Sequence, residues 1–180
     1  MIYVLLADGF EEIEALAFTD ILRRSGIDVK LVSVDNNDVV RGSHDIKVVC
    51  DIKISDIDKN TINGVVLPGG LPGTYNLKDN SSVKELLDYA NDNKIILGAI
   101  CAAPYVFEQF GYLNDIKVTV NPGFEDKMKN CILVNKRVCA DKNFITSQGP
   151  GTTHEFAKEF ISYFDNTDSA ENLVKEMLYK

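Results

Sequence analysis

Two residues of this chain have side chains that together could carry out nucleophilic chemistry, the cysteine Cys101 and the glutamate Glu14. Cys101 lies in the stretch GAICAAP, directly after the apolar run KIIL. A thiolate is a strong nucleophile, and it is also the form of cysteine that is oxidised. The chemistry to consider is therefore covalent catalysis or oxidation at one sulfur atom.

The residues around Cys101 are typical of a tight turn from a strand into a helix. Ala99 and Ala103 stand where the G-x-S-x-G nucleophile elbow of hydrolases has glycines, and larger side chains would clash there. An elbow directs the sulfur out of the sheet, beside the first N–H groups of the next helix, which favour thiolate over thiol. We therefore expect a reactive cysteine. The alternative is a small core residue, the commonest state of a free cysteine.

Glu14 is expected to be buried on the inner face of a helix. Steps of four from Glu14 reach Phe18 and Leu22, an apolar row that should face the core. The same steps from Glu12 reach Asp20. A buried carboxyl without a basic neighbour has a raised pKa, and in its protonated form it can donate a hydrogen bond to a thiolate. The other glutamates of this turn are explained by the helix dipole.

A glycine turn, LPGGLPG, follows a second apolar run, INGVV. Gly69 and Gly70 can form an ordinary tight loop, or their N–H groups can face a substrate oxygen. We expect the two apolar runs to lie near each other in one sheet, which would place this turn beside Cys101 as an oxyanion hole. The chain has no G-x-G-x-x-G or Walker sequence, so a dinucleotide or ATP cofactor is not predicted.

The elements that must position these residues follow an α/β order. Short apolar strands alternate with amphipathic helices, which indicates a mostly parallel, doubly wound, flavodoxin-like sheet with helices on both faces. Such sheets bind ligands at the carboxyl ends of their strands, where ADGFEEIE, LPGG and ICAAP all fall. We expect helices at 11–26, 81–93, 102–111, 153–164 and 171–180, strands at 2–7, 28–34, 62–70, 94–101, 117–120 and 143–148, and hairpins at 41–54 and 131–140.

Length and charge limit the class of protein. The 180 residues, 45% of them apolar, predict a single domain spanning 1–180. With 19 basic and 27 acidic side chains the net charge is −8, the wrong sign for a nucleic-acid partner. The opening MIYVLLADGFEE has no signal peptide or membrane span, so we expect a cytoplasmic protein without a membrane partner. Four cysteines without a C-x-x-C pair, and two histidines, predict neither a metal site nor a disulfide framework.

The motifs ADGFEEIEAL, VLPGG, GAICAAP and TSQGPGT, in this order over nearly the whole chain, resemble those of the ThiJ/PfpI superfamily. The similarity is to the branch of the parkinsonism-associated protein deglycase, which is glyoxalase III-like. It implies a flavodoxin-like fold of the class I glutamine amidotransferase type, a homodimer, no cofactor, and a glutathione-independent glyoxalase, deglycase, chaperone or oxidative-stress sensor. It also implies the site residues: Cys101 as nucleophilic and oxidation-sensitive cysteine, Glu14 as its protonated acid partner, and Gly69, Gly70 and Ala102 as backbone donors.

Three pocket positions differ from the family pattern. The family's pocket histidine aligns with Asn121, which precedes Pro122, and an arginine that is common in the last motif aligns with Gln148. Asn121 cannot titrate, so an acid–base step must use Glu14, water or another histidine. His44 stands where relatives often have an arginine that reaches the partner subunit's pocket, which makes it a candidate pocket residue.

Two classes of function follow from these residues. In the first, an enzyme, the Cys101 thiolate attacks the aldehyde carbon of a small 2-oxoaldehyde or one of its adducts. In the second, a redox sensor or redox-regulated chaperone, the same sulfur is oxidised to sulfinate in response to oxidative stress. A cysteine peptidase is disfavoured, because peptidase-like relatives place a histidine where this chain has Ala102. The enzyme is the leading hypothesis.

Three further candidates are assigned structural roles. Cys50 alternates with apolar neighbours and is expected in a strand. His154 begins a predicted helix, where a surface or capping role is expected. Met128 and the acidic residues of FEDKM are expected in a solvated turn.

Overall fold

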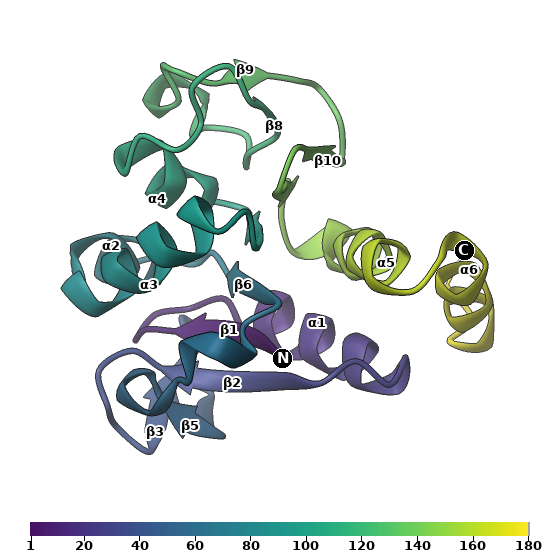
Figure 1. Ribbon diagram of the computed structural model, residues 1–180, viewed down its shortest axis with the longest axis horizontal. Coiled ribbons are helices and arrows are strands. Elements are labelled where there is room, and N and C mark those ends of the chain that lie inside the picture. The colour runs from purple at the N-terminus through teal and green to yellow at the C-terminus, as the bar shows by residue number, and fades with distance from the viewer. Residues whose placement is uncertain (180) are drawn as a thin grey trace.

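Seven strands form the central sheet of the computed structural model, which describes residues 1–179 (Figure 1). They are β1 (Ile2–Leu6), β2 (Val29–Ser33), β5 (Ile52–Lys53), β6 (Gly64–Leu67), β7 (Ile96–Ile100), β10 (Val138–Asp141) and β11 (Phe144–Ser147). Their order is β10-β11-β7-β6-β1-β2-β5. All neighbours are parallel except β10 and β11, which form an antiparallel hairpin at one edge. The predicted mostly parallel sheet is confirmed.

Helices cover both faces of this sheet, as predicted. They are α1 (Glu12–Arg24), α2 (Gly73–Asp79), α3 (Ser81–Asp92), α4 (Pro104–Gln109), α5 (Thr153–Phe164) and α6 (Thr167–Glu176). In Figure 1, α2, α3 and α4 gather on one side of the sheet, and α1 and α5 on the other, with α6 packed outside α5. No helix among residues 1–179 is both long enough and apolar enough to cross a membrane.

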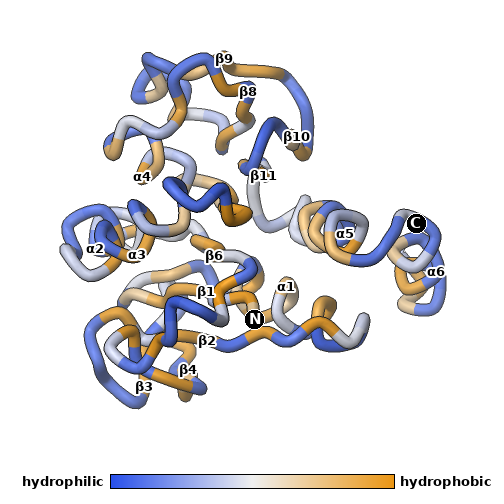
Figure 2. Tube along the Cα trace, in the orientation of Figure 1, coloured by the Kyte–Doolittle hydropathy of each residue, from blue (hydrophilic) through white to orange (hydrophobic). Residues whose placement is uncertain are grey.

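The alternation of side chains along β1 divides the interior into two cores. Tyr3 and Leu5 belong to the core under α2, α3 and α4, whereas Val4 and Leu6 belong to the core under α1 and α5. Successive residues of a strand point to opposite faces, so a fully apolar strand is needed where both faces are covered. Figure 2 shows the result, with hydrophobic colour concentrated along the strands and hydrophilic colour on the outer helices and loops.

A cluster of three phenylalanines joins α1 and α5 over the sheet. The ring of Phe18 lies 5.1 Å from that of Phe156 and 5.0 Å from that of Phe160, centre to centre. Each such pair contributes about 0.5–1.5 kcal/mol beyond the burial of its surface. Gly98 of β7 makes room for this cluster of rings, because a Cβ at residue 98 would lie 2.5 Å from Cζ of Phe160.

Several local expectations are wrong. Residues 131–140 do not form a hairpin, because β9 (Ile132–Leu133) pairs in parallel with β8 (Lys117–Val118), and β10 instead turns back onto β11. The helix α2 was not expected from the glycine-rich sequence that precedes it. The predicted last helix ends early, at Glu176 in α6, and Lys180 lies outside the described residues.

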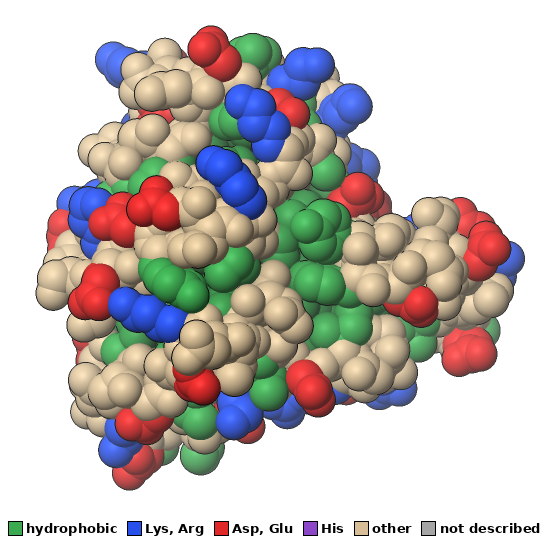
Figure 3. Space-filling model, viewed as in Figure 1, with side chains coloured by type: hydrophobic (Ala, Val, Ile, Leu, Met, Phe, Trp, Pro, Cys, Tyr) green, Lys and Arg blue, Asp and Glu red, His purple; other side chains and the backbone are tan. Residues whose placement is uncertain are grey.

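The hairpin expected in 41–54 is confirmed only in part. A hairpin is formed by β3 (Val39–Arg41) and β4 (Lys47–Val49), but it begins before residue 41, and Ile52–Lys53 instead form β5 of the central sheet. On the face of the molecule in Figure 3, basic side chains predominate over the upper part, where β8–β10 lie, and acidic and basic side chains are mixed over the rest.

Candidate active site

Three parallel strands that lie side by side bring the predicted site together. β7, β6 and β1 are neighbours, so their carboxyl ends meet at one edge of the sheet. Cys101 follows β7, Gly69 lies two residues after β6, and Glu14 lies in the first turn of α1, which follows β1. The position of Gly69 shows how close Cys101 and Glu14 are to the glycine turn. A Cβ at this residue would lie 2.7 Å from Cβ of Cys101 and 2.9 Å from Oε2 of Glu14.

The backbone at Cys101 has the strained geometry of an elbow. Its φ is +62°, a left-handed conformation that costs a non-glycine residue roughly 1–2 kcal/mol. Hydrogen bonds hold it on both sides: the Cys101 N–H donates to the Ser147 carbonyl at 2.9 Å, and the Asn121 N–H donates to the Cys101 carbonyl at 2.9 Å. Strain that is kept in place by such bonds is a feature of functional sites. The turn expected from the small neighbours of Cys101 is therefore present.

Glu14 is buried, as predicted from the helical pattern, and only 1% of its surface is exposed. Its Oε2 accepts a hydrogen bond of 2.7 Å from the Gly69 N–H. Its Oε1 has no hydrogen-bond partner among the described residues. The carboxyl interacts with the Cys101 side chain, and this contact bears on the pKa of both groups. A nucleophile and a buried acid are therefore next to each other.

The backbone donors differ from the expected set at one position. The Gly69 N–H is used by Glu14 and is not available to a substrate oxygen, so this part of the oxyanion-hole expectation is wrong. The N–H groups of Gly70 and Ala102 face the Cys101 side chain instead, and both lower the pKa of its thiol. These two N–H groups remain candidate donors to the oxyanion that forms when the sulfur attacks a carbonyl carbon.

The pKa of the thiol does not follow the expectation from a helix N-terminus. Burial first, and then the neighbouring Glu14 carboxylate, raise the pKa of Cys101 to about 12. The following helix, α4, has only six residues, so its dipole is small. Burial likewise raises the pKa of Glu14 to about 7, although the hydrogen bond from the Gly69 N–H and the neighbouring Cys101 thiol oppose the rise. The predicted direction is confirmed for Glu14.

These two shifts have a common physical cause. Cys101 and Glu14 lie together in a poorly hydrated place, so two negative charges there are strongly disfavoured. When Glu14 holds the proton, it no longer repels a thiolate and can donate a hydrogen bond to it. A proton that moves from the thiol to the Glu14 carboxylate leaves the total charge unchanged. The site can therefore form a thiolate without releasing a proton to solvent.

The raised pKa of Glu14 predicts that the stability of the protein depends on pH. The folded state holds its proton up to a pKa of about 7, against 4.5 for an ordinary glutamate. The folded state therefore binds more protons between these values, and Glu14 reduces the free energy of unfolding as pH rises through this window, by about 3 kcal/mol in all. Glu14→Gln removes this dependence and keeps the acceptor for Gly69. Its melting temperature relative to the wild type should rise from pH 5 to pH 8.

Thermal unfolding across this pH range is the measurement, and an exposed glutamate of α5, changed in Glu159→Gln, is the control. The melting temperature of Glu159→Gln should differ from that of the wild type by nearly the same amount at every pH. A constant difference for Glu14→Gln as well would show that Glu14 is already ionised at pH 5.

The three remaining predicted pocket positions lie close to the elbow, and two of them, Asn121 and Gln148, bond to each other. The Asn121 side-chain amide donates from Nδ2 to the Gln148 carbonyl at 3.0 Å, and the Gln148 N–H donates to the Arg137 carbonyl. This bond fixes the orientation of the Asn121 amide. The Gln148 side chain makes no described hydrogen bond, and Pro122 is exposed.

His44 is held by its own chain. Its Nδ1 lies 2.9 Å from Oε2 of Glu12, and its N–H donates to Oε1 of Glu12 at 2.7 Å. The Glu12 hydrogen bond raises the pKa of His44. For Glu12, burial alone would raise the pKa, but hydrogen bonds from the side chain and backbone of His44 lower it to about 2. Within one chain, His44 therefore anchors the β3–β4 hairpin to α1 rather than contacting Cys101.

One group of side chains among residues 1–179 could in principle hold a metal ion. It consists of Glu11, Glu12 and His44, whose potential ligand atoms all lie within 4.8 Å of one another. These atoms already bond to one another or to Ser43, whose Oγ lies 3.2 Å from Oε2 of each glutamate. The contacts of an ion pair account for the grouping. Glu12 was expected only to complement the helix dipole. The feature of the sequence that points to the anchoring role of Glu12 is the glycine at residue 42. A Cβ there would overlap the Glu12 carboxyl.

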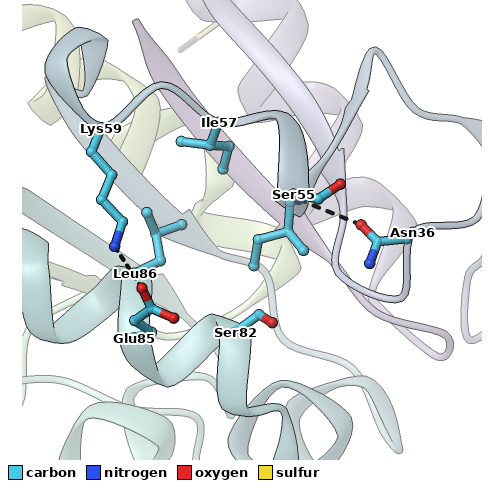
Figure 4. A pocket seen from close by; sticks show the side chains of 8 residues that line it. Asn36, Ser55, Ile57, Lys59, Ser82, Glu85 and Leu86 are labelled. Carbon is cyan, nitrogen blue, oxygen red and sulfur yellow. Dashed lines mark hydrogen bonds and ion pairs between the residues drawn. The ribbon is translucent and has the colours of Figure 1, made fainter.

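A surface cavity of about 260 Å³ lies away from this site, between α3 and the turn after β5 (Figure 4). Its lysine and glutamate pair with each other, Lys59 Nζ lying 2.7 Å from Glu85 Oε1, and the Ser55 N–H donates to Asn36. Its charged groups are therefore neutralised within the protein, and Cys101 is not among the residues that line it.

Of the residues assigned structural roles, Met128 differs from expectation. It is buried, whereas Glu125 and Asp126 are exposed as predicted. Cys50 lies just after β4 rather than within a strand, and burial raises its pKa to about 11. His154 stacks against Tyr179, with ring centres 3.4 Å apart.

Comparison with known proteins places these features in a family. Residues 1–163 match the DJ-1/PfpI family. The chain is 34% identical over 181 residues to Parkinson disease protein 7 homolog of Danio rerio, covering 98% of this chain and 96% of that protein. It is 30% identical over 169 residues to Glutathione-independent glyoxalase DJR-1.2 of Caenorhabditis elegans, covering 93% and 89%. It is 35% identical to Protein DJ-1 homolog B of Arabidopsis thaliana over 98% of this chain, but spans only 41% of that relative's length.

Solved structures agree with this assignment. The structure of oxidised Toxoplasma gondii DJ-1 superposes with a TM-score of 0.95 at 32% identity, over 99% of this chain and 97% of that one. The crystal structure of Drosophila melanogaster DJ-1beta gives a TM-score of 0.96 at 32% identity, again over 99% and 97%. The flavodoxin-like arrangement of strands and helices is thus shared over the whole length of these neighbours. The chain belongs to the DJ-1/PfpI family.

Proposed function

We propose that the protein is a cysteine-dependent enzyme that converts small 2-oxoaldehydes, or their adducts, without glutathione or another cofactor. The observation that carries this proposal is the contact between Cys101 and Glu14, a carboxyl whose pKa is about 7. A group with a pKa near the working pH is an efficient proton carrier, and here it lies beside a nucleophile. The Caenorhabditis elegans relative named as a glutathione-independent glyoxalase supports the same reaction class.

The first step is attack by sulfur. Glu14 takes the thiol proton, the Cys101 thiolate forms a C–S bond to the aldehyde carbon, and the C=O electron pair moves to oxygen. The N–H groups of Gly70 and Ala102 stabilise the oxyanion. The proton that Glu14 took then passes to this oxygen, which gives a hemithioacetal and restores the Glu14 carboxylate.

The second step is a proton shift within the bound molecule. The Glu14 carboxylate removes the hydrogen of the former aldehyde carbon, and the C–H electron pair forms the C=C bond of an enediol. Glu14 then returns this proton to the former ketone carbon, and the hydroxyl proton of the former aldehyde carbon moves to the former ketone oxygen, which leaves a thioester. The aldehyde carbon is thereby oxidised and the ketone carbon reduced, so no external oxidant is needed. Water then cleaves the resulting thioester, releasing a 2-hydroxy acid and restoring the thiol.

The test is lactate formation from methylglyoxal by the purified protein in buffer without glutathione, followed by chiral chromatography. A stoichiometric yield of lactate over many turnovers supports the proposal. Loss of methylglyoxal without lactate would mean that the protein only scavenges the aldehyde, and would overturn it.

A second function is favoured by one observation: the carboxyl next to Cys101, that of Glu14, has an oxygen, Oε1, without a hydrogen-bond partner among the described residues. A protonated carboxyl there can donate to a sulfinate oxygen, so mild peroxide should stop mainly at Cys101 sulfinate. A redox sensor or redox-regulated chaperone would use this oxidised form. Intact-mass and peptide analysis of the wild type and Glu14→Leu tests it. An unchanged distribution of oxidised forms in Glu14→Leu would remove Glu14 from this role.

Asn121→His should raise turnover of 2-oxoaldehydes. A positioned histidine contributes about 10²–10⁴-fold through acid–base catalysis, whereas an amide only orients its neighbours. The gain should be partial, because the Gln148 carbonyl holds an amide in place here. Steady-state kinetics of Asn121→His and His44→Ala give the answer. Loss of activity in His44→Ala without a gain in Asn121→His would assign the proton carrier to His44 of a neighbouring subunit.

We also propose a homodimer formed through α1 and the β3–β4 hairpin. Ile13, Val39, Ile46 and Val49 are exposed apolar side chains on these two elements, which the Ile46 N–H bond to Glu12 ties together. Light scattering after Val49→Lys should show a monomer. Leu178→Lys, which changes an exposed leucine after α6, should leave the oligomeric state unaltered. A monomeric wild type would contradict this proposal.

A further inference from the structure

Three aromatic rings surround the ammonium group of Lys127. Its Nζ lies 4.4 Å from the ring centre of Phe124, 5.3 Å from that of Tyr75 and 5.6 Å from that of Tyr105. It also donates a hydrogen bond of 2.7 Å to the Tyr75 hydroxyl. The rings of Phe124 and Tyr105 are within the distance at which an aromatic face attracts a cation. At Tyr75 the ammonium group lies beside the hydroxyl instead. The Lys127 side chain, which comes from an exposed turn, therefore has three partners: Phe124, Tyr105 and the Tyr75 hydroxyl.

Each ring belongs to a segment that also carries a candidate site residue. α2 begins just after the glycine turn, α4 begins just after the elbow, and the third segment begins at the residue that replaces the family histidine. The pairs are Tyr75 with Gly70, Tyr105 with Cys101, and Phe124 with Asn121. The Phe124 N–H donates to the Asn121 carbonyl at 3.0 Å, and the Tyr105 N–H donates to the Ala102 carbonyl at 3.1 Å. The cluster thus connects the three segments outside the site.

Two side chains attach the segment 122–127 to the rest of the protein: Lys127, and Phe124, which is half-buried and packs against the core. Most of the segment is exposed, and Gly123 has a φ of +100°. Its described hydrogen bonds run within the segment, to Asn121 or to Met128, except for the bond from Lys127 to Tyr75. Loops with few buried contacts open locally at low free-energy cost. Loss of the Lys127 contacts should therefore release this loop before it affects the core.

We propose that Lys127 is a positioning residue that latches the loop 122–127 onto α2 and α4 and thereby limits the size of molecule that reaches Cys101. The latch rests on Cys101 being the reactive sulfur of the proposed function, but not on which substrate it takes. A cation is required at residue 127, because a neutral side chain is not attracted to the ring faces. Arginine should replace lysine, since a guanidinium also stacks on aromatic rings and donates to a hydroxyl.

The first test compares Lys127→Gln, Lys127→Arg and the wild type, with Lys129→Gln as matched control. Lys129 is an exposed lysine two residues further on that contacts none of the three rings. Hydrogen exchange followed by mass spectrometry should show the 120–128 amides of Lys127→Gln exchanging about tenfold faster, with β1 unchanged. Lys127→Arg and Lys129→Gln should match the wild type. Equal exchange in all proteins, or an equal rise in β1, would overturn the latch.

The second test measures access to the sulfur. Mapped alkylation of Cys101 by a bulky fluorescein maleimide should be about tenfold faster in Lys127→Gln, while labelling by iodoacetamide should change less than about twofold. The ratio of the two rates should return to the wild-type value in Lys127→Arg. Equal acceleration of both reagents would show altered thiol chemistry rather than access, and would also overturn the proposal. Neither test measures turnover. A wild type without activity would therefore contradict the proposed function, whereas the latch would still be decided by the hydrogen-exchange and alkylation rates.

Discussion

Cys101→Ser should lower kcat/KM for methylglyoxal by about 10³-fold or more, because a hydroxyl is a much weaker nucleophile than a thiol at neutral pH. The substitution changes one atom and keeps the backbone bonds to Ser147 and Asn121, so the fold should persist. Lactate formation is measured together with the melting temperature, which separates lost chemistry from lost structure.

Cys131→Ser is the matched control. Cys131 is also free and half-buried, and it also lies beside a glutamate, Glu108. Burial and that carboxylate raise the pKa of Cys131 to about 11. What distinguishes Cys101 is its elbow and the two N–H groups that face its sulfur. Unchanged activity in Cys101→Ser, or a comparable loss in Cys131→Ser, would remove Cys101 from the reaction.

Glu14→Gln should lower kcat by about 10²–10⁴-fold, with a smaller effect on KM. Glutamine retains the size of the side chain and the acceptor for the Gly69 N–H, but it cannot exchange a proton with the thiol or the bound aldehyde. The loss should therefore appear in the chemical step rather than in binding. Steady-state kinetics at pH 7, with the melting temperature of each variant, are the measurement.

Glu108→Gln is the control for a buried glutamate outside the site. The Glu108 carboxylate accepts three hydrogen bonds of 2.8 Å from the backbone of Lys129 and from the backbone and side chain of Asn130, so this variant tests lost stability alone. Its kcat should remain near that of the wild type even if its melting temperature falls. An equal loss of kcat in both variants would mean that Glu14 acts through stability.

The order of strands and helices and the central residues of the site could be predicted from the sequence, because each depends on short-range patterns. The step of four through Glu14, Phe18 and Leu22 determines which face of α1 is buried, whatever that face packs against. The small residues around Cys101 and the glycines after β6 mark turns that other residues would not fit. Parallel strands then bring these turns to one edge of the sheet.

The pairing of residues 131–140 depended on the tertiary structure. Their alternating pattern is compatible with a hairpin, but a strand joins whichever edge its register and burial favour. β9 pairs with β8, which ends 14 residues earlier in the chain, and no local pattern encodes that pairing. β10 pairs with β11 across the two-residue turn of Lys142 and Asn143, so the hairpin is local but lies further along the chain than predicted.

The electrostatics of the site also depended on the tertiary structure. Burial of the thiol beside Glu14 outweighs a helix that proved to be six residues long, so the pKa of Cys101 rises rather than falls. The Gly69 N–H is taken by Glu14, 55 residues away in sequence, and His44 by Glu12, 32 residues away. A pKa and a hydrogen-bond partner depend on every group within a few ångströms. The sequence by itself therefore determined which groups the site contains, and the packing of distant segments decided which proton each of them holds.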